Sequence, residues 1–97
     1  MAEELSADDF IPFIGQIFQA EGQRQTLTLA TVDQPERPGR PQGLRKPFSL
    51  ILRGVRGDVL PEGSYRFTAG GRRQFELYIM PIETASPEYQ EYQIAFN

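Results

Sequence analysis

The side chains best suited to chemistry in this 97-residue chain are a lysine–serine pair and a group of late glutamates. The sequence contains no His and no Cys, which excludes the usual catalytic triads and most transition-metal sites. Lys46 and Ser49 stand three residues apart at the start of an expected strand, where their side chains face opposite sides of the sheet. This spacing does not favour a Ser/Lys nucleophile.

Four glutamates could supply a pair of carboxylates for acid–base chemistry: Glu76, Glu83, Glu88 and Glu91. A hydrolase or a carbohydrate-binding enzyme would need two of them in one deep pocket. A chain of this length buries roughly 60–65% of its unfolded surface, which is enough for one core but leaves little room for a cleft. Carboxylates along strands are typical of a solvated face. The sequence therefore predicts a protein that is not an enzyme and that holds no metal or cofactor.

The net charge of −3 is unevenly distributed along the chain. Residues 1–36 carry one Arg against seven acidic residues, residues 37–73 carry nine Lys or Arg against two, and residues 74–97 carry four acidic residues. Either the three regions neutralise one another in the folded state, or a positive patch meets an acidic partner. The candidate basic patch lies in the Pro/Gly-rich segment 33–46 and consists of Arg37, Arg40, Arg45 and Lys46.

This basic segment raises the alternative of a small barrel that binds single-stranded nucleic acid. Such proteins combine basic residues with aromatic ones, and no aromatic residue occurs between Arg37 and Lys46. The isoelectric point near 4.9 is also low for a dedicated nucleic-acid binder. The sequence therefore favours a protein partner or a homo-oligomer over nucleic acid.

Apolar alternation predicts six strands, at residues 16–20, 25–32, 48–53, 65–68, 73–82 and 89–97. The positions expected to face the core are Leu27, Leu29, Phe48, Leu50, Leu52, Phe75, Leu77, Ile79, Tyr92, Ile94 and Phe96. Nine Gly and eight Pro residues fall mostly between these runs, as in a β protein with many turns. The pattern predicts one all-β domain over residues 1–97, a small antiparallel barrel or sandwich of six or seven strands. Segment 33–46 is its long loop.

Cap and turn residues indicate how these strands are connected. Ser6 is placed to cap one short N-terminal helix, which Pro12 and Gly15 are expected to end. Residues 21–22 predict a tight hairpin. Residues 54–58 predict a turn, and turn chemistry also explains the Arg-Gly-Asp tripeptide in it, the sequence that integrins recognise.

Four apolar side chains are expected on the outward faces of the strands at 48–53, 73–82 and 89–97: Ile51, Tyr78, Met80 and Ala95. If these strands are neighbours, the four positions form an apolar patch on the solvent side of the sheet. Either a loop or the N-terminal segment covers this patch, or the patch is an interface for a partner or a second copy of the chain.

The N-terminus, Met1-Ala-Glu-Glu, is acidic and lacks an apolar run, so no signal peptide is predicted. No apolar stretch approaches the ~18 residues of a membrane span. We expect a cytoplasmic protein, or one that leaves the cell as part of a particle, and no membrane partner.

Motifs over nearly the whole chain carry a family resemblance: Phe10-x-Pro12-x-x-Gly15-x-x-Phe18, Pro47-Phe48-Ser49-Leu50-x-Leu52-Arg53-Gly54, Leu60-Pro61-x-Gly63-x-Tyr65, Phe75-x-Leu77-Tyr78-x-Met80-Pro81-Ile82 and Tyr92-x-Ile94-Ala95-Phe96-Asn97. With them the chain resembles an uncharacterised family of short bacterial all-β proteins, a domain of unknown function often encoded near phage-tail-collar-like proteins. The resemblance implies a structural role in a tail or prophage and no catalytic residues. We therefore expect a non-catalytic structural or adaptor module that binds protein.

Overall fold

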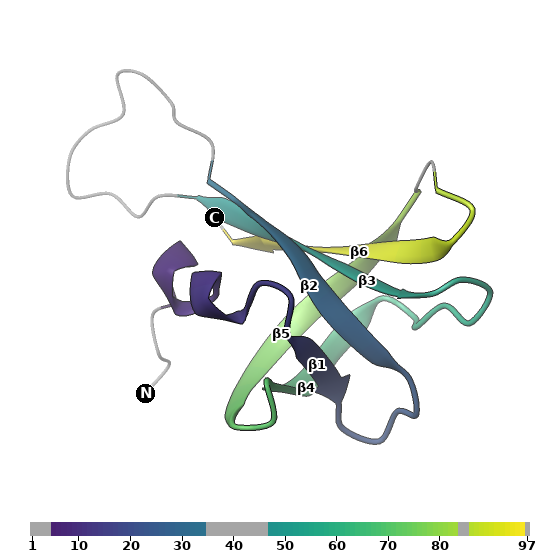
Figure 1. Ribbon diagram of the computed structural model, residues 1–97, viewed down its shortest axis with the longest axis horizontal. Helices are drawn as coiled ribbons and strands as arrows, with labels where there is room; N and C mark the ends of the chain where they lie inside the picture. The colour runs from purple at the N-terminus through teal and green to yellow at the C-terminus, as the bar shows by residue number, and fades with distance from the viewer. Residues whose placement is uncertain (1–4, 35–46, 84–85, 97) are drawn as a thin grey trace.

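The structure is a computed structural model that describes residues 5–34, 47–83 and 86–96. Within them, six antiparallel strands close into one barrel in the order β1-β2-β3-β6-β5-β4 (Figure 1). The strands are β1 (Ile17–Ala20), β2 (Thr26–Asp33), β3 (Phe48–Val55), β4 (Gly63–Ala69), β5 (Arg73–Ile82) and β6 (Tyr89–Phe96). The all-β prediction is confirmed. The barrel, not the sandwich, is the architecture, because β1 pairs with both β2 and β4.

The barrel interior is filled by apolar side chains that alternate along the strands. Among the described residues, ten large side chains have a relative solvent exposure below 2%: Tyr92, Phe10, Phe18, Phe67, Leu27, Leu29, Leu50, Leu52, Ile79 and Ile94. Burial of one such Leu or Phe side chain stabilises the fold by roughly 1.5–3 kcal/mol. The expected inward positions on β2, β3, β5 and β6 are confirmed, except that Phe96 at the end of β6 is only partly buried.

Two consecutive 3-10 turns, η1 (Ala7–Asp9) and η2 (Ile11–Phe13), form the short helical segment that the sequence predicts near the N-terminus. The Ser6 amide N–H donates to the Asp9 carboxylate at 2.8 Å, which closes the first turn. The prediction that Pro12 ends this segment is wrong. Pro12 lies inside the first turn of η2, where the amide proton that proline lacks has no intrahelical partner to lose.

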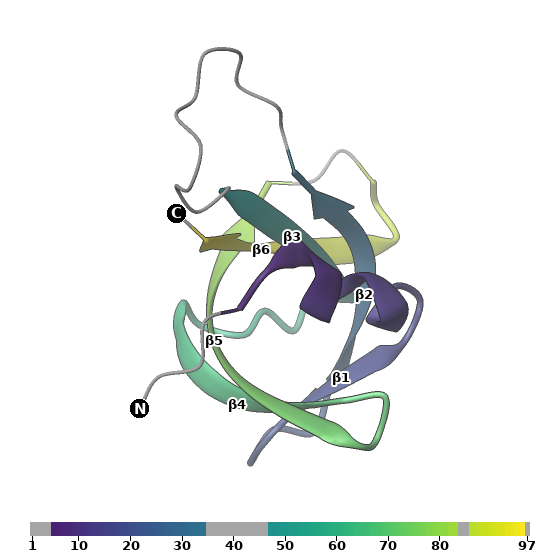
Figure 2. The same cartoon turned by 90° about the vertical axis from the view of Figure 1, so that its left-hand side faces the viewer.

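This N-terminal segment closes one end of the barrel. Toward that end β5 separates from β6, because the pairing between them is confined to Met80–Ile82 of β5. The Phe10 ring fills the gap, with its centroid 4.6 Å from that of Phe75, 5.6 Å from Phe96 and 5.9 Å from Phe48. Figure 2 shows the segment lying across the opening between β2 and β5.

The connection between β3 and β4, residues 56–62, closes the opposite end. Leu60 is buried there, and its amide N–H donates to the Tyr92 hydroxyl at 2.9 Å. Two further hydrogen bonds tie the same connection to the barrel, from Gln25 Nε2 to the Asp58 carbonyl and from the Tyr65 hydroxyl to the Pro61 carbonyl. The backbone of this connection is therefore held in place before any partner binds.

The connection between β1 and β2 differs from the tight hairpin that the sequence predicts. It spans residues 21–25, and the Gln19 side chain donates from Nε2 to the Gln23 carbonyl at 2.7 Å, which stabilises the wider loop. The expected long loop also starts later than predicted, because β2 continues to Asp33. Residues 35–46 of that loop lie outside the described part of the chain.

Candidate functional site

Two of the predicted interface residues share one row on the outer surface of the barrel. Ile51 of β3 and Met80 of β5 both pair with Gln93 of β6, which lies between them. Their side chains point outward, since the residues before them, Leu50 and Ile79, face the core. The expectation that these three strands are neighbours is confirmed.

The other two predicted interface residues flank this row. Ala95 is exposed and pairs with Ser49 of β3. Tyr78 is 48% exposed, but it pairs with Ser64 of β4, and its hydroxyl donates to the Glu62 carboxylate. That hydrogen bond raises the pKa of Tyr78 above the ordinary value of 10.0. Tyr78 therefore stands at the edge of the surface, tied to the β3–β4 connection.

Further side chains extend the surface beyond the predicted four. Ile82 lies beside Glu91, and Val55, which is 57% exposed, pairs with Tyr89. Arg53 Nε lies 3.1 Å from Glu91 Oε2, and the Arg53 guanidinium lies 4.4 Å from the centroid of the Tyr89 ring. The outward surface of β3, β6 and β5 is termed the outer apolar face. Its apolar members are Ile51, Val55, Tyr78, Met80, Ile82, Tyr89 and Ala95.

The N-terminal segment does not cover this face. Phe10 and Phe13 are buried at the end of the barrel, against aromatic rings of the core. Of the two coverings that the sequence allowed, the one by residues 5–16 is therefore not found. The basic patch predicted in the long loop, Arg37, Arg40, Arg45 and Lys46, lies outside the described residues.

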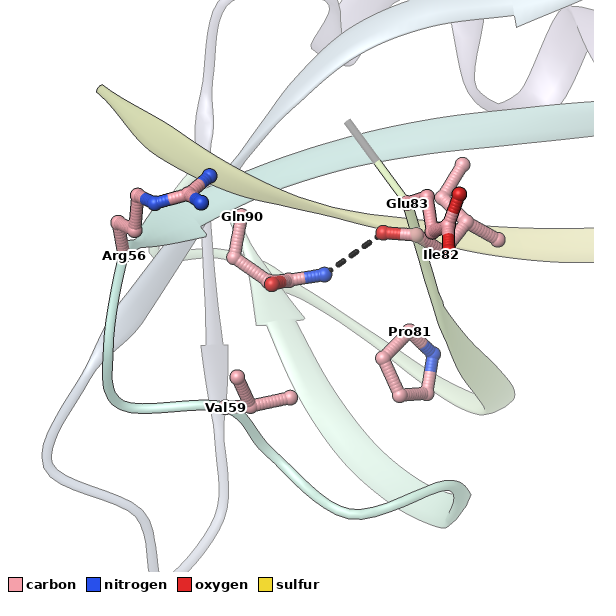
Figure 3. Close-up of a pocket in the computed structure, with 6 residues that line it drawn as sticks. All are labelled: Arg56, Val59, Pro81, Ile82, Glu83 and Gln90. Carbon is pink, nitrogen blue, oxygen red and sulfur yellow. Dashed lines mark hydrogen bonds between the residues drawn. The ribbon is translucent and has the colours of Figure 1, made fainter. Parts of the chain in front are cut away.

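An open hollow of about 420 Å³ adjoins the outer apolar face at the β3–β4 connection (Figure 3). Its lining residues are Arg56, Val59, Pro81, Ile82, Glu83 and Gln90. Gln90 Nε2 donates to the Ile82 carbonyl at 2.8 Å, and in Figure 3 the Arg56 and Glu83 side chains stand on opposite sides of Gln90. Because Ile82 belongs to both, the hollow and the face form one continuous surface, in which Val59, Pro81 and Ile82 lie beside the polar side chains of Arg56, Glu83 and Gln90.

The Arg-Gly-Asp tripeptide lies in the turn that follows β3. The expected turn over residues 54–58 begins late, because β3 continues to Val55. Gly57 adopts a φ of +93°, a backbone conformation that glycine tolerates best. The side chain of Arg56 donates a hydrogen bond from Nη1 to the Ser86 carbonyl at 2.8 Å. The arginine thereby links the β3–β4 and β5–β6 connections, which gives the tripeptide a structural explanation.

Three exposed isoleucines form a second apolar surface that the sequence reasoning missed. Ile11, Ile14 and Ile17 are 48%, 45% and 52% exposed and follow one another at every third residue from η2 into β1. Ile17 also lines an open groove of about 480 Å³ beside Gly70. In the strand order, β1 lies across the barrel from β6, so Ile17 and the outer apolar face are on opposite sides.

Ion pairs within the described residues join the basic middle of the chain to both acidic ends. Arg53 contacts Glu91, and Arg73 Nη1 lies 3.5 Å from Asp9 Oδ1. The pKa of Asp9 is lowered, chiefly by the hydrogen bond from the Ser6 amide and further by the Arg73 guanidinium. These pairs favour the interpretation in which the three charged regions neutralise one another.

The glutamates considered for acid–base chemistry are distributed over the outside of the barrel. Glu76 and Glu91 lie on strands, and Glu83 and Glu88 lie in the β5–β6 connection. In the part of the chain that the structure describes, no three or more His, Cys, Asp or Glu residues come together in a way that could hold a metal ion. No helix in the same residues is long and apolar enough to cross a membrane.

Together these features define a class of protein: a small closed β-barrel with a packed interior, connections that close both ends and apolar side chains on its outside. Within that class, the chain belongs to the family described as a domain of unknown function, DUF6916, which matches residues 5–96. The expected membership of a domain of unknown function is thus confirmed. Searches of the curated proteins and of the solved structures gave no significant match.

Proposed function

We propose that this protein is a non-catalytic structural or adaptor module that binds another protein through the outer apolar face. One observation carries the proposal: Ile51 and Met80, both half-buried, flank Gln93 on the outward side of the sheet, with half-buried Ile82 two residues further along β5. Single exposed apolar residues are normal on any protein surface, whereas contiguous ones indicate a surface that another molecule covers.

The packing of the barrel supports a site on the outside. Its interior is occupied by the fully buried side chains of the core, so a partner has to contact the outer surface. Where β3, β6 and β5 are paired, their backbone groups are already hydrogen-bonded to one another. A partner would therefore bind there through side chains and not by adding a strand.

The residue types on the face agree with this role. Tyrosine, methionine and arginine are enriched in protein–protein interfaces, and the face presents Tyr78, Tyr89, Met80 and Arg53. Val59, beside the face, is 46% exposed on a connection that is hydrogen-bonded to the barrel. Little conformational freedom would be lost there on binding, which favours affinity.

The kind of assembly is part of the same proposal. The resemblance noted in the sequence implies an association with phage-tail-collar-like proteins, and on that basis we propose a partner in a phage-tail-like assembly. The protein would then be cytoplasmic or incorporated in such a particle. The alternative, binding of single-stranded nucleic acid by the basic 37–46 loop, stays a prediction from sequence, because that loop lies outside the described residues.

The proposal is tested with the double variant Ile51→Thr/Met80→Thr. Threonine keeps the strand propensity at both positions and removes apolar contact area. Proteins captured from native cell extract by the tagged wild type are identified by mass spectrometry, purified and titrated against each variant. We expect the double variant to bind such a partner about 10-fold more weakly or worse.

The matched control is Ile14→Thr/Ile17→Thr, which removes apolar area from the opposite side of the barrel. This control should bind the purified partner with the affinity of the wild type. Equal affinity of the wild type and the Ile51→Thr/Met80→Thr variant, with both folded, would show that the outer apolar face is not the binding surface.

A further inference from the structure

The outer apolar face carries opposite charges on neighbouring strands at its middle. Arg53 of β3 is the direct cross-strand partner of Glu91 of β6, with Nε and Oε2 3.1 Å apart. On one side of this pair lies the row that contains Ile51, and on the other lie Val55 and Tyr89. A cation and an anion at adjacent positions, with Ile51 on one side and Val55 and Tyr89 on the other, make a surface that can be complementary to itself.

Self-complementarity requires a particular symmetry axis. Two copies that meet through this face can be related by a two-fold axis. The axis runs parallel to the boundary between β3 and β6 (the seam) and lies just above the outward surface. Such an axis sets β3 of one copy over β6 of the other. Because Arg53 and Glu91 are register partners across that seam, Arg53 of each copy then faces Glu91 of the other. The same operation sets Val55 over Tyr89 and Ile51 over Gln93.

We propose that the occupant of the outer apolar face is a second copy of this chain, held in a two-fold dimer with two intermolecular Arg53–Glu91 contacts. This inference rests on the proposed function, since it uses the same surface and names the partner. In the dimer, the ion pair that each copy makes within itself becomes part of a four-membered network of alternating charge.

Charge and exposure favour a second copy over an unrelated partner of one sign. Arg53 and Glu91 cancel, so the middle of the face attracts neither a strongly acidic nor a strongly basic surface. The side chain of Arg53 is still 45% exposed and that of Glu91 19% exposed, which leaves both within reach of a second copy. Val55, at 57% the most exposed large apolar residue described, gains an aromatic neighbour in the dimer.

The test uses charge reversal at the central pair. Arg53→Glu makes the middle of the face doubly negative, and Glu91→Arg makes it doubly positive. Each variant alone should be monomeric, because a two-fold dimer would bring like charges together at two places. We expect the dimer Kd of each to rise about 100-fold or more over the wild type. An equimolar mixture of the two variants should form a heterodimer, and the double variant Arg53→Glu/Glu91→Arg should dimerise again.

The measurement is light scattering behind size exclusion and sedimentation velocity at low salt, for each protein and for the mixture. Arg66→Glu and Glu76→Arg are the matched control, because Arg66 and Glu76 are also cross-strand partners but on β4 and β5, outside the proposed contact. Both controls should remain dimeric. Val55→Glu serves as a second variant that an exposed position tolerates. It should be folded by circular dichroism and monomeric, since it places a carboxylate against the face of the partner's Tyr89 ring.

The outcomes separate this inference from the function on which it rests. A wild type that stays monomeric at about 100 µM overturns the dimer. The proposed function is then tested separately, by whether the Ile51→Thr/Met80→Thr variant binds a purified partner more weakly than the wild type does. A wild-type dimer that survives Arg53→Glu, Glu91→Arg and Val55→Glu also overturns the inference, because it must use another surface. Dimers that are lost in each single variant and recovered in the mixture support it.

Discussion

Gly54, next to the end of the β3–β6 pairing, occupies a position where the barrel leaves no room for a side chain. A Cβ atom there would lie 2.5 Å from Leu27 Cδ2 and 3.4 Å from Tyr92 Cε1. Both of these side chains are fully buried, so neither can move aside without disturbing the packed core. Glycine thus allows close approach of β2 and β6 to β3.

Gly54→Ala should therefore destabilise the protein by about 1–3 kcal/mol through overpacking. Urea unfolding monitored by circular dichroism measures this loss. The clash involves the end of the Leu27 side chain, so Leu27→Val in the same chain should make the alanine less costly than it is in the wild type. If the losses of unfolding free energy from the two substitutions simply add in the double variant, the Leu27 side chain is not what the new Cβ atom clashes with.

At the scale of elements, the N-terminal 3-10 turns have little intrinsic stability, because each contains a single short turn. They are ordered by the burial of Phe10 between β3, β5 and β6, and by Asp9, which accepts the Ser6 amide hydrogen bond and contacts Arg73. The N-terminal segment is thus fixed both by packing and by a carboxylate whose pKa is lowered.

Asp9→Asn should lower the free energy of unfolding near neutral pH. It should also make that free energy change less as the pH falls. The pKa of Asp9 is lower in the folded state than the ordinary value of 3.8, so its contribution is present above that value. The contribution is lost as pH falls through the folded-state pKa. Urea unfolding between pH 2 and 7 should show a loss of about 0.5–1 kcal/mol near neutrality that vanishes in acid. Asp8→Asn, in the same turn but exposed, is the control and should behave as the wild type.

At the scale of the whole molecule, much of the fold could be predicted from the sequence. Strict alternation at Phe48, Leu50 and Leu52 indicates which face is buried, and that information is local. Closure of the barrel is not local. It depends on the pairing of β1 with β4, two segments separated by more than forty residues, and β1 is only four residues long. Periodicity therefore does not distinguish the barrel from the sandwich.

The candidate site was predictable to the extent that it depends on the same alternation. Ile51 and Met80 were placed on the outward face correctly, because each follows a clearly apolar inward residue. Val55 was missed because Gly54 resembles the start of a turn, although here it is a strand residue. The exposed isoleucines were missed because exposure in a 3-10 segment depends on which side packs against the barrel, and periodicity does not contain that information.

The connection that closes the second end of the barrel is held in part by one buried hydroxyl, that of Tyr92. It accepts the hydrogen bond of the Leu60 amide, and Tyr92→Phe would leave that buried amide without its acceptor. We expect a loss of about 1–3 kcal/mol at neutral pH. The matched control is Tyr65→Phe, which removes a hydroxyl from an exposed hydrogen bond to the same connection and should cost less.

The alkaline pH dependence gives a second readout of the same variant. Burial raises the pKa of Tyr92 above the ordinary value of 10.0, so the unfolded chain loses this proton first as pH rises. Stability from this group is complete below pH 10 and is lost as pH rises through the folded-state pKa. The difference in unfolding free energy between Tyr92→Phe and the wild type should therefore become smaller above pH 10. The raised pKa of Tyr78 makes the stability of both proteins depend on pH in this range, but it affects the two alike. Unfolding curves at pH 8 to 11 measure this gap, and a gap that stays constant would mean that Tyr92 titrates alike in the folded and unfolded chains.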